Sequence, residues 1–211
     1  MPAKKSLGQH WLNDRSILEA IVDFGGITKD DTVLEIGPGQ GSLTSVLLRR
    51  AKQVVAVEVD PVLAAKLPGM FPGKRLSLHR QDILAFNLNG LPPGYKVAAN
   101  LPYYLTGKII RLLLEAANPP QDAVLLVQKE VAERLAAGPG KLSLSGVAAQ
   151  FYCRVSLGPL VNAELFSPPP KVDSRAVRLL RRRPAEWPHA DPKTYFKVVK
   201  AGFSAPRKQL R

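Results

Sequence analysis

Short apolar runs rich in β-forming residues alternate with helix-like segments from Thr32 to about Leu180. A chain with this alternation builds βαβ units, because each helix carries the chain back across the sheet before the next parallel strand. The expected strands are Thr32–Ile36, Val54–Val59, Arg75–His79, Lys96–Ala99, Ala123–Val127, Tyr152–Leu157 and Ala176–Leu180. The expected helices lie near Ser42–Ala51, from Pro61 onward, and over Thr106–Ala116, Val131–Ala137 and Ser143–Phe151. The sequence therefore predicts an α/β fold of the Rossmann-like kind, with a mostly parallel sheet flanked by helices.

The two ends of the chain break this alternation. Residues 1–15 are polar, basic and aromatic, and we expect a flap rather than a packed element beside a central domain of residues 16–183. After Pro184, the segment Lys193–Gly202 has the period of an amphipathic helix. Its expected apolar side carries Tyr195, Phe196 and Val199, and its outward side carries Lys197 and Lys200. Residues 184–211 would then form a linker and the start of a truncated helical domain.

The charge of the chain favours a polyanionic partner. Its 30 Lys and Arg residues exceed its 17 Asp and Glu residues and give a formal net charge of +13. This excess attracts nucleic acid and accelerates its docking, and an acidic membrane surface is the main alternative. No apolar run approaches the roughly 18 residues that span a bilayer, and the first residues do not form a signal peptide. The single Cys153 permits no intrachain disulfide and the histidines are scattered, so we expect a cytoplasmic protein without a metal.

A glycine-rich segment, Glu35-Ile-Gly37-Pro-Gly39-Gln-Gly41, connects the first expected strand to the helix that follows it. Glycines at such a turn let the backbone bend tightly and approach a ligand without clashes from Cβ atoms. Related spacings occur in dinucleotide sites, but two features favour S-adenosylmethionine (SAM). The glycines are spaced GxGxG rather than GxGxxG, and Glu35 would repel a pyrophosphate at the helix N-terminus. The ammonium and sulfonium groups of SAM are instead cationic.

Two further acidic residues follow later strands. Glu58 ends the second expected strand, where a carboxylate can accept hydrogen bonds from both hydroxyl groups of a ribose. NAD sites use the same arrangement, and a solvated acid at a strand end is the structural alternative. Asp82 follows the third strand and is placed to accept from an adenine amino group, with a helix N-cap as its alternative role. With Glu35, these acids mark the carboxyl ends of successive strands, where open α/β sheets bind ligands.

The segment Asn100-Leu101-Pro102-Tyr103 follows the fourth expected strand and precedes a helix. The amino nitrogen of adenine is a weak nucleophile, because its lone pair is delocalised into the ring. An amide oxygen and a backbone carbonyl that each accept one N6–H would make this nitrogen more tetrahedral and aim its lone pair at a methyl donor. Pro102 fixes the turn, and Tyr103 offers a π face to an extruded base. An ordinary strand-to-helix turn is the alternative interpretation.

These motifs resemble those of the small-subunit ribosomal RNA adenine N6-dimethyltransferases, the KsgA/RsmA family. The resemblance runs from about Lys4 to Leu180, with matching segments in the same order. The segments are Lys5–Leu12 (KSLGQHWL), Glu35–Gly41, Asn100–Tyr103, Gln128–Leu135 (QKEVAERL) and Phe166–Ser174 (FSPPPKVDS). The resemblance implies a class I SAM-dependent methyltransferase that dimethylates two adjacent adenosines in the 3′-terminal hairpin of small-subunit rRNA. It also implies S-adenosylhomocysteine as the cofactor product and the immature 30S subunit as the partner of a monomeric enzyme.

The resemblance assigns roles to individual residues. The implied cofactor contacts are Gln9, His10, Leu12, Gly37, Gly39, Glu58, Asp82 and Asn100. The implied catalytic residues are Asn100, Leu101, Pro102, Tyr103 and Phe166, of which Tyr103 and Phe166 would sandwich the target base. The implied RNA contacts are Lys4, Lys5, Lys171, Arg207 and Lys208. Phe166 precedes three prolines, which suits a rigidly presented ring, and an aromatic at the edge of the core is its structural alternative.

The sequence departs from the family pattern in two places. His10-Trp11 stand where the pattern often has Asn-Phe, so we expect the backbone contact of His10 to persist whatever its side chain does. The helical C-terminal domain of the family is almost wholly absent from this sequence.

Three other functions remain as alternatives. One is a methyltransferase of the macrolide-resistance type, which acts on adenine in large-subunit rRNA; Gly37-Pro38-Gly39 and Lys171-Val-Asp-Ser favour the small-subunit group instead. Another is a ribosome-assembly factor that binds RNA without catalysis, against which the intact Asn100–Tyr103 motif argues. An NAD-dependent oxidoreductase is the third, and no catalytic His or Tyr-Lys pattern supports it.

Overall fold

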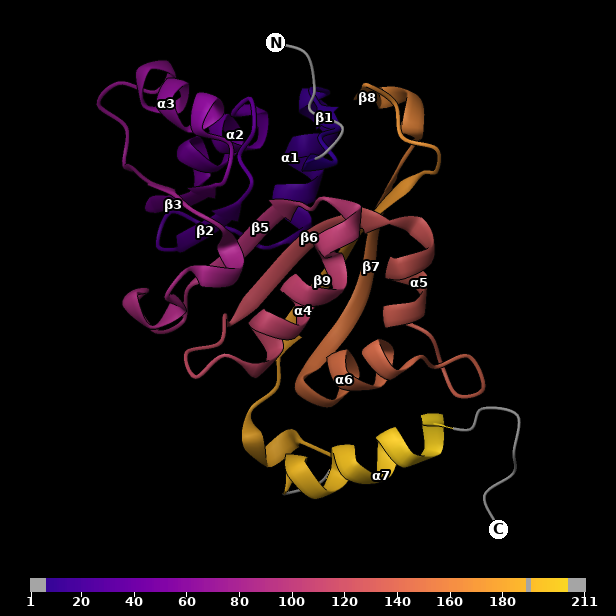
Figure 1. Ribbon diagram of the computed structural model, residues 1–211. Helices are drawn as coiled ribbons and strands as arrows, with labels where there is room; N and C mark the ends of the chain where they lie inside the picture. The colour runs from indigo at the N-terminus through magenta and orange to yellow at the C-terminus, as the bar shows by residue number, and fades with distance from the viewer. Residues whose placement is uncertain (1–6, 189–190, 205–211) are drawn as a thin grey trace.

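The computed structural model describes residues 7–188 and 191–204 of the protein (Figure 1). Within this part of the chain, a seven-stranded sheet has the order β4-β3-β2-β5-β6-β9-β7. Its strands are β2 Thr32–Ile36, β3 Gln53–Glu58, β4 Leu76–Arg80, β5 Lys96–Asn100, β6 Asp122–Gln128, β7 Cys153–Val161 and β9 Ser174–Arg181. Strands β2 to β6 are parallel, and β9 runs antiparallel to both β6 and β7. The predicted α/β fold with a mostly parallel sheet is confirmed.

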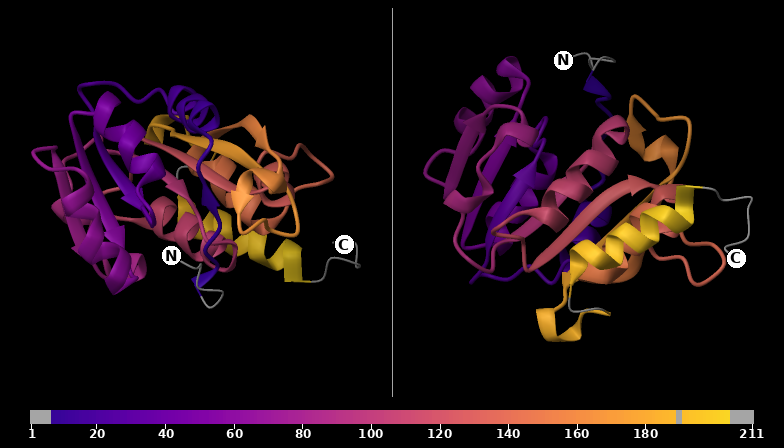
Figure 2. Two further views of the ribbon diagram at one scale, coloured as in Figure 1. Left: turned by 90° about the horizontal axis from the view of Figure 1, so that it is seen from above. Right: turned by 60° about the horizontal axis from the view of Figure 1, so that its bottom comes forward.

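Helices cover both faces of this sheet, as the two views in Figure 2 show. The helices are α1 Arg15–Phe24, α2 Ser42–Arg50, α3 Pro61–Met70, α4 Thr106–Glu115, α5 Lys129–Leu135, α6 Leu144–Tyr152 and α7 Pro192–Ser204. Helices α1 and α2 share one hydrophobic core with Val33, whereas α4 to α6 share a second core with Leu34 on the opposite face. Successive strand residues point to opposite faces, so a strand buried on both sides has a nearly continuous apolar sequence.

The local sequence accounts for where several helices begin. The side chain of Asp14 accepts a hydrogen bond from the backbone N–H of Ile17 and caps α1. Asp60 caps α3, and Pro61 occupies its first turn, where a missing N–H costs no hydrogen bond. Ser143 caps α6 in the same way as the two aspartates. These caps fix where the three helices begin, and the sequence predicted the starts of α3 and α6 to within a residue.

Residues 7–12 pack against the body of the protein through a strand pairing that the sequence did not predict. Strand β1, Trp11–Leu12, pairs antiparallel with β8, Phe166–Ser167. The side chain of Leu12 is only 3% exposed and belongs to the core beneath α1 and α2. The pairing was not predicted because the partner strand comes from a distant segment, which a local pattern does not reveal.

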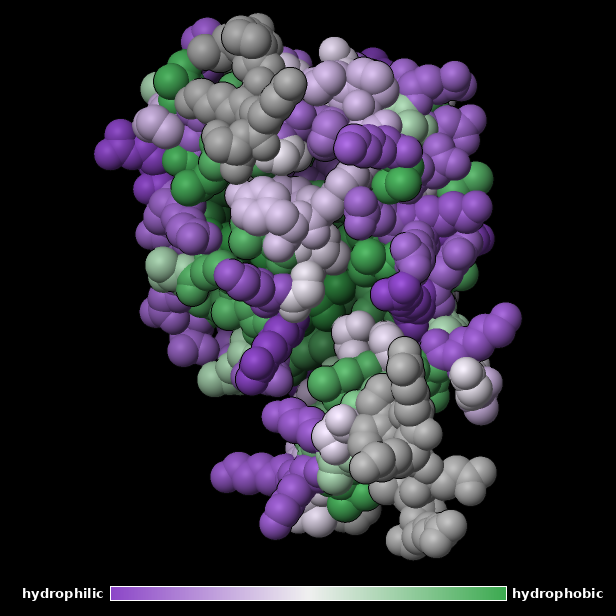
Figure 3. Space-filling model, turned by 45° about the vertical axis from the view of Figure 1, so that its right-hand side comes forward, coloured by the Kyte–Doolittle hydropathy of each residue, from purple (hydrophilic) through white to green (hydrophobic). Residues whose placement is uncertain are grey.

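Helix α7 is amphipathic, as predicted. The rings of Tyr195 and Phe196 lie 4.6 Å and 5.1 Å from the ring of Phe151 on α6, measured between centroids. Lys197 and Lys200 are exposed. Figure 3 shows long hydrophilic side chains projecting from the bottom of the molecule, where α7 lies. The helix is therefore held by an aromatic cluster and presents a basic surface.

Two features are absent from the described part of the chain. No helix in residues 7–188 or 191–204 is long and apolar enough to cross a membrane. In the same residues, no group of three or more His, Cys, Asp or Glu side chains is arranged to hold a metal ion.

Candidate active site

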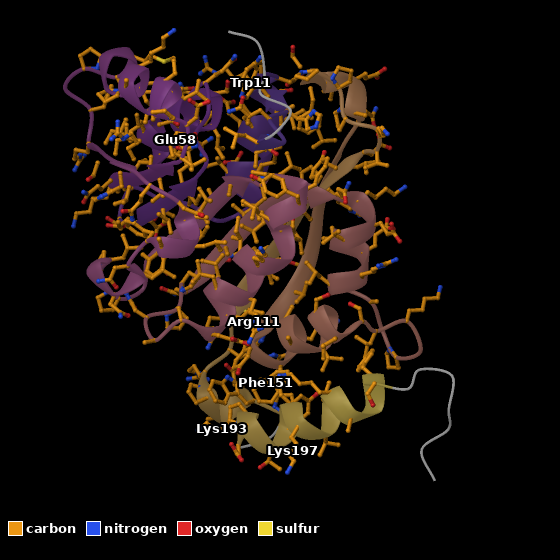
Figure 4. All side chains as sticks on the ribbon, in the orientation of Figure 1. Trp11, Glu58, Arg111, Phe151, Lys193 and Lys197 are labelled. Atoms are coloured by element: carbon orange, nitrogen blue, oxygen red, sulfur yellow. The ribbon has the colours of Figure 1, made fainter. Side chains whose placement is uncertain are left out.

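A hollow opens at the carboxyl ends of the parallel strands. It encloses about 1040 Å³, part of it open to solvent, between residues 7–12, the ends of β2 to β5 and the turn after β5. It is lined by all the predicted cofactor residues and by most of the predicted catalytic ones: Gln9, His10, Leu12, Gly37, Gly39, Glu58, Asp82, Asn100, Leu101, Pro102 and Tyr103. In Figure 4, Trp11 and Glu58 at this hollow lie at the opposite end of the molecule from Lys193 and Lys197 of α7. The fold thus gathers motifs that are far apart in the sequence.

The glycine turn after β2 forms one wall of the hollow. Gly39 has φ of 57°, in the left-handed region that glycine tolerates best, and its backbone N–H donates to Glu58 Oε2 at 3.0 Å. A Cβ atom on Gly39 would lie 3.3 Å from Nε1 of Trp11, so the indole already covers this turn. Glycine is needed here both for the conformation and for the close approach of Trp11.

Glu58 is fixed between two backbone turns. Its carboxylate is 5% exposed, and Oε1 accepts from the N–H of Asp60 at 2.8 Å while Oε2 accepts from Gly39. This burial excludes the alternative of a solvated acid at a strand end. Each oxygen keeps a second lone pair, so the carboxylate can still accept hydrogen bonds from two neighbouring hydroxyl groups of a ligand.

Asp82 takes the helix-capping role that the sequence left open and also lines the hollow. It lines the hollow just after β4, and its Oδ1 accepts from the N–H of Leu84 at 2.9 Å, which makes it the N-cap of a short 3-10 helix, Ile83–Ala85. The cap holds the carboxylate in place and leaves its other oxygen for a ligand amino group. A capping role and a binding role are therefore compatible at this residue.

Glu35 is the most deeply buried acid of the site. It is 1% exposed, and among the described residues neither carboxyl oxygen has a hydrogen-bond partner. Burial raises the pKa of Glu35 to about 8, and the negative charge of Glu58 adds to the rise, while the adjacent Thr44 on α2 opposes it. At neutral pH the carboxyl is therefore protonated in this structure, and a cationic ligand such as SAM in the hollow would favour its ionised form.

Asn100 ends β5 at the centre of the hollow. Its Nδ2 donates to the backbone carbonyl of His10 at 3.0 Å, which fixes the orientation of the amide and leaves Oδ1 as an acceptor. The turn that follows is rigid, because the carbonyl of Pro102 accepts from the N–H of Leu105 at 3.0 Å. Leu101 is buried and lines the hollow with its neighbours. The geometry supplies the fixed amide oxygen that the motif predicts.

Tyr103 is held at both its ring and its hydroxyl group. Its ring stacks on His10 with centroids 5.7 Å apart and planes inclined by 21°. Its hydroxyl lies 2.8 Å from Oγ of Ser174, and burial raises its pKa, so the phenol stays neutral in the physiological range. His10 therefore covers one face of the Tyr103 ring, and a base predicted by the motif would have to stack on the other face.

Gln9 and Leu12 attach residues 7–12 to the site. Nε2 of Gln9 donates to Oδ2 of Asp60 at 3.3 Å, next to the turn that holds Glu58. Leu12 fills the core below the hollow. This segment therefore forms a roof that is anchored at both of its ends.

Phe166 differs from its predicted role. It is 4% exposed and packs in the core with Leu12, and it does not line the hollow. The structural alternative, an aromatic at the edge of the core, describes it better, because pairing of β8 with β1 turns the ring inward. Stacking on a base would require the ring to leave this core.

The predicted RNA contacts are only partly described. Lys171 is exposed in the loop before β9, at the same end of the sheet as the hollow. Lys4, Lys5, Arg207 and Lys208 lie outside the described residues.

The hollow is also lined by residues that the sequence did not predict, among them Trp11, Val59, Ile83 and Tyr104. Val59 and Ile83 each follow a predicted acid directly, and Val59 is exposed at the hollow. The sequence could have indicated Val59 and Ile83 as site residues, because a flat nucleobase needs apolar surface on its faces and each of them is an apolar residue next to a predicted acid. Trp11 could not be found this way, since it reaches the glycine turn only through the pairing of β1 with β8.

A comparison with protein families identifies the family to which the chain belongs. A family model described as Ribosomal RNA adenine dimethylase matches residues 2–211. The chain belongs to this family. It is 39% identical over 214 residues to the Ribosomal RNA small subunit methyltransferase A of Dehalococcoides mccartyi (strain CBDB1), a match that covers 100% of this chain and 74% of that protein. It is 40% identical over 220 residues to the protein of the same description in Geobacillus thermodenitrificans (strain NG80-2), covering 98% and 74%.

Solved structures agree with this family. A dimethyladenosine transferase from Plasmodium falciparum has a TM-score of 0.82 and 30% identity, over 95% of this chain and 73% of that one. The 23S rRNA methyltransferase ErmE has a TM-score of 0.83 and 30% identity, over 94% and 81%. The fold of this ribosomal RNA adenine dimethylase is that of the class I SAM-dependent methyltransferases, and use of SAM follows from family and fold.

Proposed function

We propose that this chain transfers methyl groups from SAM to N6 of two adjacent adenosines in the 3′-terminal hairpin of small-subunit rRNA. The observation that carries the proposal is the fixed Asn100 amide, which lies in one hollow with three strand-end carboxylates. Support for the small-subunit substrate comes from the relatives at 39% and 40% identity, which are described as small-subunit methyltransferases.

The residues of the hollow fit SAM by their chemistry. Glu58 would accept from the ribose hydroxyl groups and Asp82 from the adenine amino group, with Val59 and Ile83 against the adenine faces. Glu35 would face the cationic part, and Gly37, Gly39 and residues Gln9 to Leu12 would enclose the remainder. When bound, SAM supplies an electrophilic methyl group on a sulfonium and leaves as S-adenosylhomocysteine.

The protein contributes positioning to the transfer. Oδ1 of Asn100 accepts one N6–H of the adenine, and the backbone carbonyl of Leu101 accepts the other, so the nitrogen lone pair is directed at the methyl group. Tyr103 stacks on the base, and Pro102 keeps the turn rigid. With SAM held by these residues, the nitrogen–carbon bond would form as the sulfur–carbon bond breaks, and the methylated nitrogen would release its proton to water. No side chain with a pKa near neutrality has to act as a base.

The partner and the setting extend the same proposal. The substrate is the immature 30S subunit in the cytoplasm, and the enzyme acts as a monomer. Residues 16–183 perform the chemistry, residues 1–15 close over the cofactor, and residues 184–211, which include α7, contact RNA. Lys171 would contact phosphate beside the hollow. Lys4, Lys5, Arg207 and Lys208 are proposed as further phosphate contacts.

A second candidate substrate is adenine in large-subunit rRNA, because the fold is also similar to that of the 23S rRNA methyltransferase ErmE. Both candidates are tested together by incubating the protein and labelled SAM with undermethylated 30S particles and, separately, with unmodified 50S particles. We expect labelled N6,N6-dimethyladenosine at two adjacent positions of the small-subunit hairpin. Label in 50S particles alone would establish the second candidate, and absence of transfer to either would refute the proposed function.

A further inference from the structure

His10 connects three segments that meet at the active site. Its Nδ1 lies 2.8 Å from the backbone carbonyl of Pro168, in the loop between β8 and β9. Its ring stacks on Tyr103 of the catalytic turn, and its own backbone carbonyl accepts from Asn100. The residue is half-buried and lines the hollow. One histidine thus contacts Asn100, Tyr103 and a loop that comes 158 residues later in the sequence.

The contact with Pro168 determines the tautomer of the ring. A carbonyl oxygen only accepts hydrogen bonds, so Nδ1 must carry the proton. The neutral ring therefore has Nε2 unprotonated, whereas a histidine free in water prefers the proton on Nε2. The imidazole is held at one edge by the carbonyl of Pro168 and at one face by the ring of Tyr103. These two contacts restrict rotation of both rings.

We propose that the His10 side chain is a positioning residue for methyl transfer: it sets the plane of Tyr103 against the loop at Pro168, so that the target base stacks beside Asn100. This inference rests on the proposed function. The backbone carbonyl of His10 holds the Asn100 amide whatever its side chain is, so the side chain adds a separate contribution, the orientation of the stacking ring.

Three substitutions separate the two contacts of the imidazole. In His10→Asn, Nδ2 stands two bonds from Cβ as Nδ1 of histidine does, so the hydrogen bond to Pro168 is kept and the stack is lost. In His10→Phe, the ring stack is kept and the hydrogen bond is lost. In His10→Ala, both are lost. All three keep the backbone contact with Asn100.

The kinetic test measures kcat at saturating SAM, KM for 30S particles and SAM affinity by calorimetry. We expect kcat to fall roughly 10- to 100-fold in His10→Ala, because small displacements of a reacting group cost rates of this order. His10→Asn and His10→Phe should each restore part of the rate, while SAM affinity and the melting temperature change little. If all three variants keep the wild-type kcat, or if SAM affinity falls while kcat is intact, the positioning role is wrong.

A second readout needs no cofactor and no RNA. The ring nitrogens of ¹⁵N-labelled protein are observed by NMR at a pH where imidazoles are neutral, and His10→Asn identifies the signal of His10 among the three histidines. We expect the Nδ1–H tautomer, and finding Nε2–H would overturn the inference. If wild-type protein transfers no methyl groups, the proposed function fails, yet the tautomer still shows whether His10 is held as we infer.

Discussion

Asn100 donates its side-chain amide hydrogen to the backbone carbonyl of His10 at 3.0 Å, across 90 residues of sequence. The contact decides which end of the amide is an acceptor. An asparagine without such a partner could present either its nitrogen or its oxygen to a substrate amino group, and only the oxygen can accept an N6–H. Residues 7–12 therefore fix the side-chain oxygen of Asn100 as the available acceptor before any substrate binds.

Replacement of Asn100 by alanine tests this arrangement. We expect Asn100→Ala to lower kcat for methyl transfer by roughly 100-fold or more, because a fixed hydrogen-bond partner at the reacting atom is lost. The fold should persist, since the side chain is only half-buried. Transfer of labelled methyl groups to 30S particles measures the effect. Asn89→Ala, at an exposed asparagine outside the hollow, is the matched control, and near-normal rates in Asn100→Ala would refute the positioning mechanism.

Replacement of Glu58 separates cofactor binding from catalysis. In Glu58→Gln, an amide takes the place of a carboxylate that accepts from two backbone N–H groups and, as we propose, from the ribose. Hydrogen bonds to a charged group contribute about 1.5–3 kcal/mol, so SAM affinity should fall roughly 10- to 100-fold. Calorimetric titration measures this, with exposed Glu164→Gln as the control. Unchanged affinity would remove Glu58 from the cofactor site.

Much of the site could be predicted from sequence because its parts follow strands. The glycine turn, Glu58, Asp82 and Asn100 each lie at or just after the end of one strand of a parallel sheet, and the carboxyl ends of such strands meet at one edge. Helix α1 was not predicted, although the cap at Asp14 before an apolar face is a local signal for it. Elements and motifs of this kind are encoded within a few residues of chain.

The rest depends on contacts between distant segments. A phenylalanine before prolines has the same local sequence whether its ring is exposed or buried, and only the pairing of β1 with β8 places Phe166 in the core. The contacts of His10 with Pro168 and Tyr103, and of Trp11 with Gly39, have the same origin. Sequence patterns place elements, but they do not say which loops close over a site.

Two glycines should respond to alanine in opposite directions. Gly41 has φ of 83°, and a Cβ there would lie 3.0 Å from side-chain atoms of Leu67 and Phe71, so Gly41→Ala should lower the free energy of unfolding by about 1–3 kcal/mol. Gly107 lies in α4, and a Cβ added there would meet no atom within 4 Å, so Gly107→Ala should raise the same free energy by up to about 1 kcal/mol. Urea denaturation compares them. Equal effects would contradict the strained turn at Gly41.

The affinity for RNA should depend steeply on salt. Each phosphate contact releases counterions and adds about −0.7 to −0.9 to the slope of log affinity against log salt concentration. Lys171→Ala should make the slope less steep by about one contact, because Lys171 is exposed at the end of the sheet that carries the hollow. Lys52→Ala, just before β3 at the other end of the strands, is the control. A flat profile for the wild type would mean that the net charge of +13 serves another purpose.

Stability should depend on pH through Glu35. The pKa of its buried carboxyl is raised to about 8, compared with 4.5 for the unfolded chain, so between these values the folded protein holds a proton that the unfolded chain releases. The unfolded state then binds fewer protons, and the free energy of unfolding falls as pH rises, by at most about 1.4 kcal/mol per pH unit for one proton. The contribution is complete below pH 4.5 and is lost as pH rises through about 8.

Glu35→Gln isolates this contribution, because glutamine has the same shape and does not titrate. Both proteins are unfolded with urea from about pH 5.5 to about pH 8.5. As pH rises, the unfolding free energy of the wild type should fall relative to that of the variant. The other titrating groups contribute equally to both curves and cancel in the difference. If the two curves stay parallel, Glu35 is ionised in the folded protein over this whole range, as it is in the unfolded chain, and its pKa is not raised by burial.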